Sequence, residues 1–434
     1  MFKHIQTHSC PCGREHIFTS KIILERGAIH RLPSLLKEET WKHVFLIADQ
    51  HTYIAAANLV VESLSKNDIN VKTYIFEEEN VEPDEASVGR AIMNFDPTCD
   101  VIIAVGSGVI NDIGKIVANV SRKPYIIVGT APSMDGYASA TSSMTLEGLK
   151  MSLNSKCADI IIGDLDVLCN APIKMMLSGL GDMLAKYISI CEWRISHLIT
   201  GEYYCEEIAG LVRDALRKCV NNANGLLNRD EEAVKAVFEG LVICGAAMKF
   251  AGLSRPASGI EHYFSHIWDM RGVEFHTPVE LHGLQCAVGT LLSLSLYEKI
   301  KTTTPDKEKA LRYAKAYDFD AWSGTLRAFL GKGAESMIRA EAKEQKYDLL
   351  KHKERLTLII EKWDDILQII DEELPAPTEL ESLFNKIGLP KTPAEIGIDE
   401  SNLATTFQAT KDIRDKYVLS RLCWDLGIID EMFS

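Results

Sequence analysis

The chain has 434 residues, which is too many for one compact core and indicates two domains. Its hydrophobic fraction of 46% and charged fraction of 25% are those of an ordinary soluble globular protein, and its net charge of −14 argues against nucleic-acid binding. No stretch approaches the ~20 apolar residues that cross a bilayer, and Met1–Arg14 lacks the apolar core of a secretory signal. We therefore expect no membrane partner and a cytoplasmic location.

The cysteines support that location. Their count of 11 is odd and they are scattered, which is typical of reduced, buried thiols. Cys10 and Cys12, flanked by His8 and His16, could form a metal clip. Their spacing is tighter than that of the usual two-cysteine knuckle, so we interpret them as ordinary thiols.

The first part of the chain alternates short apolar runs with helical patterns such as Tyr53–Ser65 and Glu85–Asn94. This alternation predicts a mostly parallel sheet covered on both faces. The expected strands are Lys21–Leu24, Val44–Ala48, Val71–Phe76, Val101–Val105, Tyr125–Val128 and Asp159–Ile162.

After Asp166 the strand patterns stop, and long stretches show apolar residues at helical spacing. The expected helices include Met176–Glu192, Glu202–Asn222 and Glu231–Phe250. The chain is therefore expected to be α/β plus all-α: a parallel-sheet α/β domain over residues 1–170, followed by a helical domain over residues 171–434.

A glycine turn follows the strand at Val101–Val105. Gly106, Ser107 and Gly108 lead directly into a predicted helix, so backbone amides and the positive helix end can face a pyrophosphate. The turn departs from the usual dinucleotide fingerprint, because position 111 is asparagine and no acid follows about twenty residues later. Asp49, at the end of an earlier strand, can bind an adenosine ribose if that strand lies beside the glycine strand.

A second loop, Gly129–Ser139, follows the next strand and is rich in small and hydroxylated residues. The alternative interpretation of this loop is a surface turn rich in serine and glycine, and the glycine turn taken alone is equally compatible with a plain strand-to-helix connection. Two such loops at successive strand ends favour a nucleotide site at the carboxyl edge of the sheet.

Histidines crowd the middle of the chain. His262 and His266 are four residues apart and share a helix face, while His282 is expected to begin another helix. Asp182, after a pair of glycines, is also expected to begin a helix. One carboxylate and two imidazoles suit a divalent metal that keeps open coordination positions. His276 is left out of the site.

These segments together resemble the iron-containing alcohol dehydrogenase and dehydroquinate synthase superfamily, and most closely its sn-glycerol-1-phosphate dehydrogenase family. The resemblance runs in family order over roughly the first two thirds of the chain. The segments that carry it are Gly106–Asp112, Thr130–Gly136, Gly181–Lys186, Arg255–His262, His266 and His282–Gly283.

The resemblance implies that residues 1–170 form a Rossmann-like dinucleotide-binding domain, that residues 171–434 form a helical metal- and substrate-binding domain, and that a cleft lies between them. It also implies roles for individual residues. Asp182, His262 and His282 would hold the metal; Asp182 and His266 would be catalytic and, with Asp135, would bind the substrate. The residues implied to bind NAD or NADP are Asp49, Gly106, Ser107, Gly108, Val109, Ile110, Thr130, Ala131, Pro132, Ser133 and Ser139.

The implied activity is the reversible reduction of dihydroxyacetone phosphate to sn-glycerol 1-phosphate by NADH or NADPH. The alternatives are a dehydrogenase of an unphosphorylated polyol such as glycerol, and a dehydroquinate synthase-like cyclase. Asp182 argues against the cyclase, since synthases of the superfamily usually have glutamate there. The donor set accepts zinc, nickel or iron.

Arg255 and a charged segment after Leu330 lie outside these assigned roles. Arg255 is a candidate for the substrate phosphate, and a structural cation at a helix start is an equal interpretation. Leu330–Glu372 is longer and more charged than the family suggests, and we interpret it as a solvated helical face. A homo-oligomer is expected, with a dimer favoured.

Overall fold

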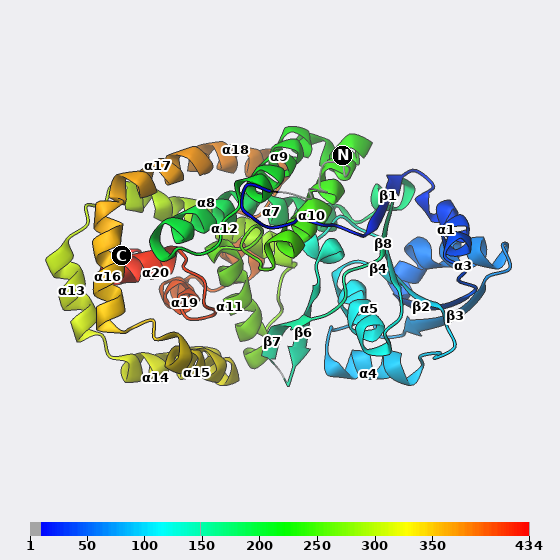
Figure 1. Cartoon of the computed structure of the whole chain (residues 1–434), viewed down its shortest axis with the longest axis horizontal. Coiled ribbons are helices and arrows are strands. Elements are labelled where there is room, and N and C mark those ends of the chain that lie inside the picture. The colour runs from blue at the N-terminus through cyan, green and yellow to red at the C-terminus, as the bar shows by residue number, and fades with distance from the viewer. Residues whose placement is uncertain (1–9, 148, 434) are drawn as a thin grey trace. The chain divides into compact units, whose positions relative to one another are not determined.

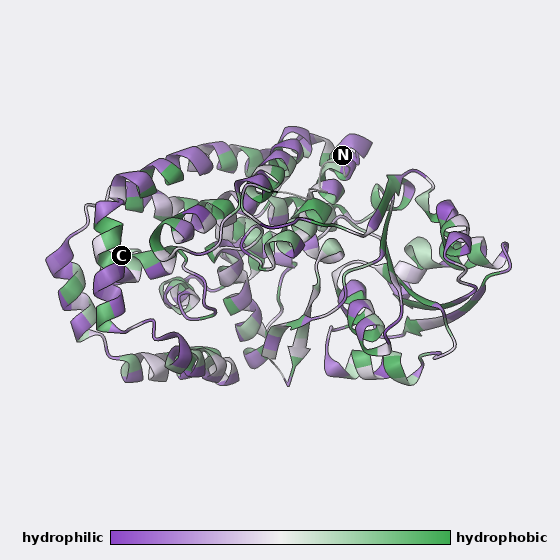
Figure 2. Ribbon diagram, in the orientation of Figure 1, coloured by the Kyte–Doolittle hydropathy of each residue, from purple (hydrophilic) through white to green (hydrophobic). Residues whose placement is uncertain are grey.

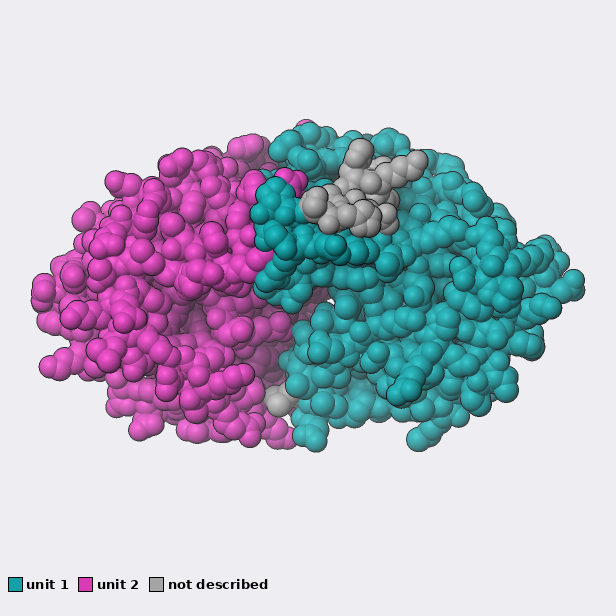
Figure 3. All heavy atoms as spheres, viewed as in Figure 1, with its two compact units in different colours: residues 1–183, 210–253 teal, residues 184–209, 254–434 magenta. Residues whose placement is uncertain are grey.

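The computed structural model describes residues 10–147 and 149–433, which fall into two compact units (Figures 1 and 3). Unit 1 contains the described residues up to Met183 together with Gly210–Leu253. Unit 2 contains Leu184–Ala209 and the described residues from Ser254 onward. The expected boundary at residues 170/171 marks the end of the strands, but the helices that follow are shared between the units.

Unit 1 is built on a six-stranded sheet in the order β1-β8-β5-β4-β2-β3. Every pairing within it is parallel, which confirms the predicted class of sheet. Each expected strand is present; five have slightly wider bounds, and the strand expected at Asp159–Ile162 begins one residue later and ends two residues later. The strands are β1 (Lys21–Glu25), β2 (His43–Asp49), β3 (Asn70–Phe76), β4 (Val101–Gly106), β5 (Tyr125–Gly129) and β8 (Ile160–Asp164).

The sheet forms because its central strands are apolar along their whole length. In Figure 2 much of the sheet is green, and the strand residues Val101–Val105 are fully buried. Alternate residues such as Ile103 and Val105 share a core with Leu36 and Leu64 from the covering helices. The helices that lie wholly within the unit are α1 (Leu32–Glu38), α2 (Gln50–Thr52), α3 (Asn58–Ser65), α4 (Glu85–Met93), α5 (Gly108–Ser121), α6 (Leu165–Leu168) and α10 (Glu231–Ala251).

An antiparallel hairpin that the sequence did not predict follows the second loop. It pairs β6 (Thr141–Leu146) with β7 (Leu149–Asn154). Its two strands contain two threonines but no valine, isoleucine or aromatic residue, so the sequence carries only a weak strand pattern. Contacts outside the hairpin support it: the Ser142 hydroxyl donates to the Asp112 carbonyl at 3.1 Å, and the Ser143 amide donates to the Asp112 carboxylate at 3.2 Å.

The predicted helix Met176–Glu192 is two helices, α7 (Ile173–Leu184) and α8 (Lys186–Thr200). Asp182 therefore lies near the end of α7 and does not begin a helix, so that expectation was wrong. Gly179, one of the two glycines that suggested a start, serves close packing instead. A Cβ on Gly179 would lie only 1.8 Å from the Pro132 carbonyl oxygen.

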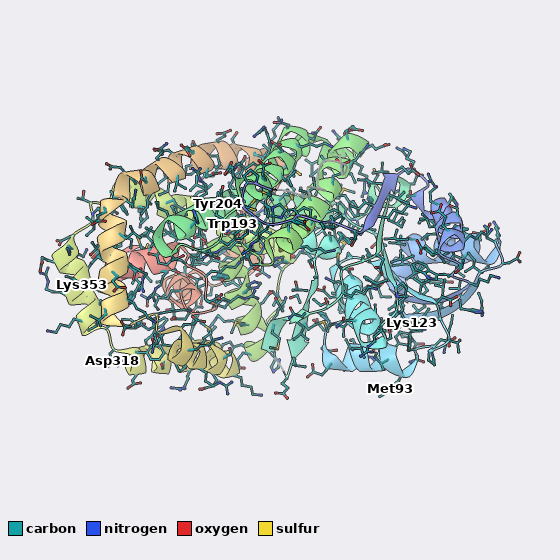
Figure 4. All side chains as sticks on the ribbon, viewed as in Figure 1. Met93, Lys123, Trp193, Tyr204, Asp318 and Lys353 are labelled. Carbon is teal, nitrogen blue, oxygen red and sulfur yellow. The ribbon has the colours of Figure 1, made fainter. Side chains whose placement is uncertain are left out.

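Unit 2 is helical. Trp193 of α8, labelled in Figure 4, donates from its indole to the Tyr203 carbonyl at 2.6 Å and meets the Tyr204 ring edge-on at 4.9 Å, which fixes the turn after the helix. Helix α9 (Glu206–Asn222) has residues in both units. The further helices are α11 (Ile260–Phe275), α12 (His282–Lys301), α13 (Lys307–Ala316), α14 (Phe319–Leu330), α15 (Ala334–Glu344), α16 (Leu349–Glu361), α17 (Trp363–Glu373), α18 (Pro377–Ile387), α19 (Leu403–Thr410) and α20 (Leu419–Asp425).

The charged segment Leu330–Glu372 forms amphipathic helices. In α16 and α17, apolar residues such as Ile359 and Ile370 are fully buried while most of the charged residues face solvent; Arg355 is an exception, because it pairs with the buried Asp425 at 2.9 Å. Among the described residues, no helix combines the length and apolar character needed to cross a membrane.

Candidate active site

A cavity of about 780 Å³ opens in unit 1 at the carboxyl ends of the parallel strands. This edge of an open α/β sheet is where such folds bind nucleotides. The cavity contains four of the residues expected to bind the cofactor: Asp49, Ser107, Thr130 and Ala131. Its other lining residues include Gly27, His30, Asp164, Asp166, Asn170 and Met175, which carried no recognisable motif in the sequence.

Asp49 is held in place by its own helix start. Its carboxylate accepts the Thr52 amide at 2.7 Å, and the Thr52 hydroxyl accepts the Asp49 amide at 3.0 Å. This reciprocal cap orients the carboxylate at the cavity rim. Strand β2 pairs with β4, so the arrangement that Asp49 required beside the glycine strand is present.

The glycine turn joins β4 to α5 as expected. Gly106 ends the strand, and a Cβ there would lie 2.5 Å from the Ile110 side chain. Helix α5 begins at Gly108, so the amides of its first turn, including that of Val109, have no intrahelical partner and suit an anion. Ile110 is buried, and any contribution to binding comes from its backbone.

The second loop packs against helix α7. The Ser133 carbonyl accepts the Ser178 hydroxyl at 3.1 Å, and Pro132 lies against Gly179. The Ser139 hydroxyl lies 3.3 Å from the ammonium group of Lys115 and is buried away from the cavity lining.

Lys115 is a supporting residue that sequence reasoning missed. Its fully buried ammonium donates to the Gly136 carbonyl at 3.2 Å and pairs with Asp112 at 2.9 Å. Asn111, one turn earlier, donates to the same carbonyl at 3.1 Å. A lysine on the apolar face of the helix after the glycine turn was the available signal.

The two predicted carboxylates of unit 1 are adjacent. The Asp135 amide donates to the Asp182 carboxylate at 2.9 Å. Asp182 is fully buried on α7, while Asp135 is half-buried in the loop after Met134. The loop that follows β5 is thereby tied to the helix that carries Asp182.

Three imidazoles converge within unit 2. The ring centroid of His262 lies 5.1 Å from that of His282, and the centroid of His266 lies 6.1 Å from that of His282. His282 is the first residue of α12, as predicted. Close helix packing brings the rings together, since a Cβ on Gly289 would lie 2.6 Å from the Glu261 carbonyl oxygen.

Each of two rings is oriented by a neighbour. His262 Nδ1 lies 2.8 Å from the Glu261 carboxylate, and His282 Nδ1 lies 3.0 Å from the Ser265 hydroxyl. Carboxylate and hydroxyl partners of this kind fix the ring orientation of metal-binding histidines and direct Nε2 to the ion. Glu261 and Ser265 were missed, although both lie on the predicted histidine helix.

Cys286 adds a third donor atom in unit 2. Its sulfur and nitrogen atoms of His262 and His282 all lie within 4.8 Å of one another. Burial raises the pKa of the Cys286 thiol, but the two imidazoles outweigh burial and hold the pKa below its ordinary value. The signal in the sequence was its position four residues after His282.

Glu192 supports the start of the histidine helix. Its carboxylate accepts the Ile260 amide at 2.9 Å and the Leu419 amide at 2.7 Å. Burial, with a smaller effect from Glu261, raises the pKa of Glu192 to about 8.

Arg255 and His276 have structural positions. The Arg255 guanidinium is buried and donates to Glu202 at 2.9 Å, to Ser196 at 2.9 Å and to the Tyr417 carbonyl at 2.9 Å. These contacts support the interpretation of Arg255 as a structural cation. His276 ends α11 in a left-handed conformation with φ 53° and is exposed.

Comparison with known proteins gives concordant results. A family model of iron-containing alcohol dehydrogenases matches residues 23–172. A glycerol-1-phosphate dehydrogenase (NAD(P)+) of Bacillus velezensis is 33% identical over 311 residues, covering 70% of this chain and 79% of the relative. The protein of the same name from Halalkalibacterium halodurans is 28% identical over 415 residues, covering 94% of each chain.

Solved structures share the fold. Glycerol dehydrogenase from Schizosaccharomyces pombe superposes with a TM-score of 0.62 at 20% identity, covering 97% of this chain and 92% of that one. The NADH-dependent butanol dehydrogenase A of Thermotoga maritima gives a TM-score of 0.61 at 15% identity, covering 97% and 99%.

Proposed function

Because the chain belongs to the glycerol-1-phosphate dehydrogenases within the iron-containing alcohol dehydrogenases, we propose that it reversibly reduces dihydroxyacetone phosphate to sn-glycerol 1-phosphate with NADH or NADPH. The observation that carries this proposal is the cluster of His262, His266 and His282, in which two rings have their Nδ1 atoms engaged by neighbours. That arrangement suits cation binding rather than core packing.

The proposed metal ligands are His262 and His282 of unit 2 and Asp182 of unit 1. Imidazole and carboxylate donors fit zinc, nickel or iron. A bound divalent cation supplies Lewis-acid stabilisation of negative charge on the substrate oxygen. Glu261 and Ser265 keep the two rings in one orientation, so little reorganisation accompanies binding of the ion.

The proposed cofactor site is the cavity of unit 1. Asp49 binds ribose hydroxyls, the first turn of α5 and the Gly106–Gly108 turn face the pyrophosphate, and Thr130 and Ala131 form the adjoining wall, while Pro132, Ser133 and Ser139 support the loop behind that wall. The reduced nicotinamide supplies the hydride. The carboxylate of Asp49 opposes a 2′-phosphate, so NADH is the preferred cofactor.

His266 provides the proton. Reduction of the ketone requires one hydride at carbon and one proton at oxygen, and an imidazole titrates in the range where proton transfer at neutral pH is efficient. His266 delivers that proton directly or through a water molecule. Asp135 and Asp182 position the substrate.

The remaining parts of the proposal concern assembly and location. A small phosphorylated metabolite is the substrate, the enzyme is cytoplasmic, and it is a homo-oligomer for which a dimer is the simplest form. Scattered thiols outside any disulfide fit a reducing compartment.

The test follows NADH oxidation with dihydroxyacetone phosphate for the parent, Asp182→Asn and His262→Ala. We expect both variants to lose activity by at least about a hundredfold, the scale typical of removing an electrostatic contribution at a reacting centre. His276→Asn is the matched control and keeps parent activity, because asparagine tolerates the left-handed backbone. Parent activity in Asp182→Asn, or faster turnover of dihydroxyacetone than of its phosphate, contradicts the proposal.

A further inference from the structure

We propose that Cys10, Cys12 and His16 bind a second metal ion, best suited to zinc, that fastens the first described segment of unit 1. The two sulfur atoms and a ring nitrogen of His16 all lie within 4.8 Å of one another. None of these residues has a part in the proposed reduction. The site is therefore structural and independent of the proposed activity.

A tight turn presents the two thiols. The Gly13 amide donates to the Cys10 carbonyl at 2.9 Å, and Pro11 lies between the cysteines with its φ fixed by the ring. Gly13 has φ +80°, a left-handed conformation that a side chain would strain. The sequence between the cysteines and His16 therefore folds back on itself, which a count of residues alone does not show.

His16 completes the group from the other side of the turn. Its Nε2 lies 3.3 Å from the Cys12 sulfur, and the residue is only 2% exposed, while both cysteines are half-buried. The sequence favoured ordinary thiols because the spacing of the cysteines is short. The structure adds His16 as a converging donor; His8, the other histidine considered, lies outside the described residues.

The residues around the proposed site connect the first described segment to the end of α10. The His16 ring lies 5.5 Å from the Phe250 ring, and Arg14 donates to the Ala251 carbonyl at 3.2 Å. Phe18 meets Phe250 edge-on at 6.3 Å. These contacts hold an irregular segment against the end of α10, and a metal on Cys10, Cys12 and His16 would close that attachment.

The donor chemistry selects the ion. Two thiolates and one imidazole suit zinc, and the two negative charges neutralise the dication, which lowers the cost of partial burial. Binding releases the two thiol protons. Structural zinc takes four ligands, so one further donor completes the shell, and serine substitution of the other cysteines one at a time identifies whether it is a thiolate.

The primary test counts zinc in the full-length protein. Cys10→Ser combined with Cys12→Ser should lower the zinc content by about one equivalent per chain, the amount one structural site holds. Cys169→Ser, another half-buried cysteine of unit 1, is the matched control and keeps the parent content. Unchanged zinc in the double variant overturns the proposal. Because the readout is metal content, failure of the proposed dehydrogenase activity leaves it intact.

A second measurement uses only the parent protein, so it tests the site even if the double variant does not fold. Alkylation of the native parent, read by mass spectrometry, should spare Cys10 and Cys12 until a strong chelator is added, whereas modification of Cys169 is independent of the chelator. Zinc X-ray absorption should also show sulfur neighbours near ~2.3 Å. Equal modification of Cys10 and Cys12 with and without chelator overturns the site.

Discussion

Substituting Gly179 by alanine tests the link between the carboxylate helix and the cofactor cavity. The new Cβ would lie 1.8 Å from the Pro132 carbonyl oxygen and 3.1 Å from a methyl carbon of Leu241. Because the oxygen belongs to the backbone, it cannot escape by rotation, and the gap must widen by about 1.2 Å to reach even the shortest tolerated contact of 3.0 Å.

That movement displaces the Thr130–Ser133 loop or α7. Overpacking of this kind costs about 1–3 kcal/mol of unfolding free energy. A shift near 1 Å at a positioning loop lowers turnover by about a hundredfold. We therefore expect Gly179→Ala to have a lower denaturation midpoint, a higher KM for NADH and a strongly reduced kcat.

The matched control is Gly210→Ala, at a helical glycine of α9 where an added Cβ would meet no atom within 4 Å. Alanine there should leave activity unchanged and stabilise the helix by up to ~1 kcal/mol. Denaturant unfolding and NADH titration of both variants are the assays. If Gly179→Ala unfolds and binds NADH like the parent, the packing argument is wrong.

Three further predictions concern single side chains. Ser265→Ala, which removes the hydroxyl beside His282, should weaken metal affinity about 10- to 100-fold in chelator competition; an unchanged affinity excludes an orienting role. Asp49→Asn keeps the helix cap but removes the charge, so the kcat/KM ratio of NADPH to NADH should rise about tenfold, ~1.4 kcal/mol, and no change would place the 2′-phosphate elsewhere. Burial raises the pKa of Glu192 to about 8 from an ordinary 4.5, so between these two pH values the folded chain keeps a proton that the unfolded chain releases. The stability that this proton contributes is complete below pH 4.5 and is lost progressively as the pH rises to about 8. Unfolding free energies across that window should fall by up to ~1.4 kcal/mol per pH unit more steeply in the parent than in Glu192→Gln, and parallel curves would contradict the assignment.

Much of the fold could be predicted from local patterns. Continuous apolar runs such as Val101–Val105 bury both faces and therefore mark strands of a parallel sheet without any tertiary information. His282 could be placed at a helix start because Pro278 precedes it closely and an apolar pattern follows. The β6–β7 hairpin could not be predicted in this way, because its residues Ser142 and Ser143 depend on hydrogen bonds to Asp112, which is 30 and 31 residues away from them in the sequence.

The candidate site likewise contains residues that local patterns identify and residues that they do not. Residue types and motifs pointed to the histidines and to Asp49, but not to what holds them. Gly179 was taken as a sign of a helix start, whereas its role is close approach to Pro132. Lys115 and Ser265 act through contacts that depend on helix packing, which a single sequence does not specify.

The central claim is that Asp182, His262 and His282 bind one cation. Anomalous diffraction from crystals grown with nickel or zinc, recorded at the metal edge, measures this directly. We predict a peak within ~2.0–2.2 Å of a carboxylate oxygen of Asp182 and of a ring nitrogen of each histidine. Metal bound to the two histidines with the Asp182 carboxylate out of reach would contradict the claim.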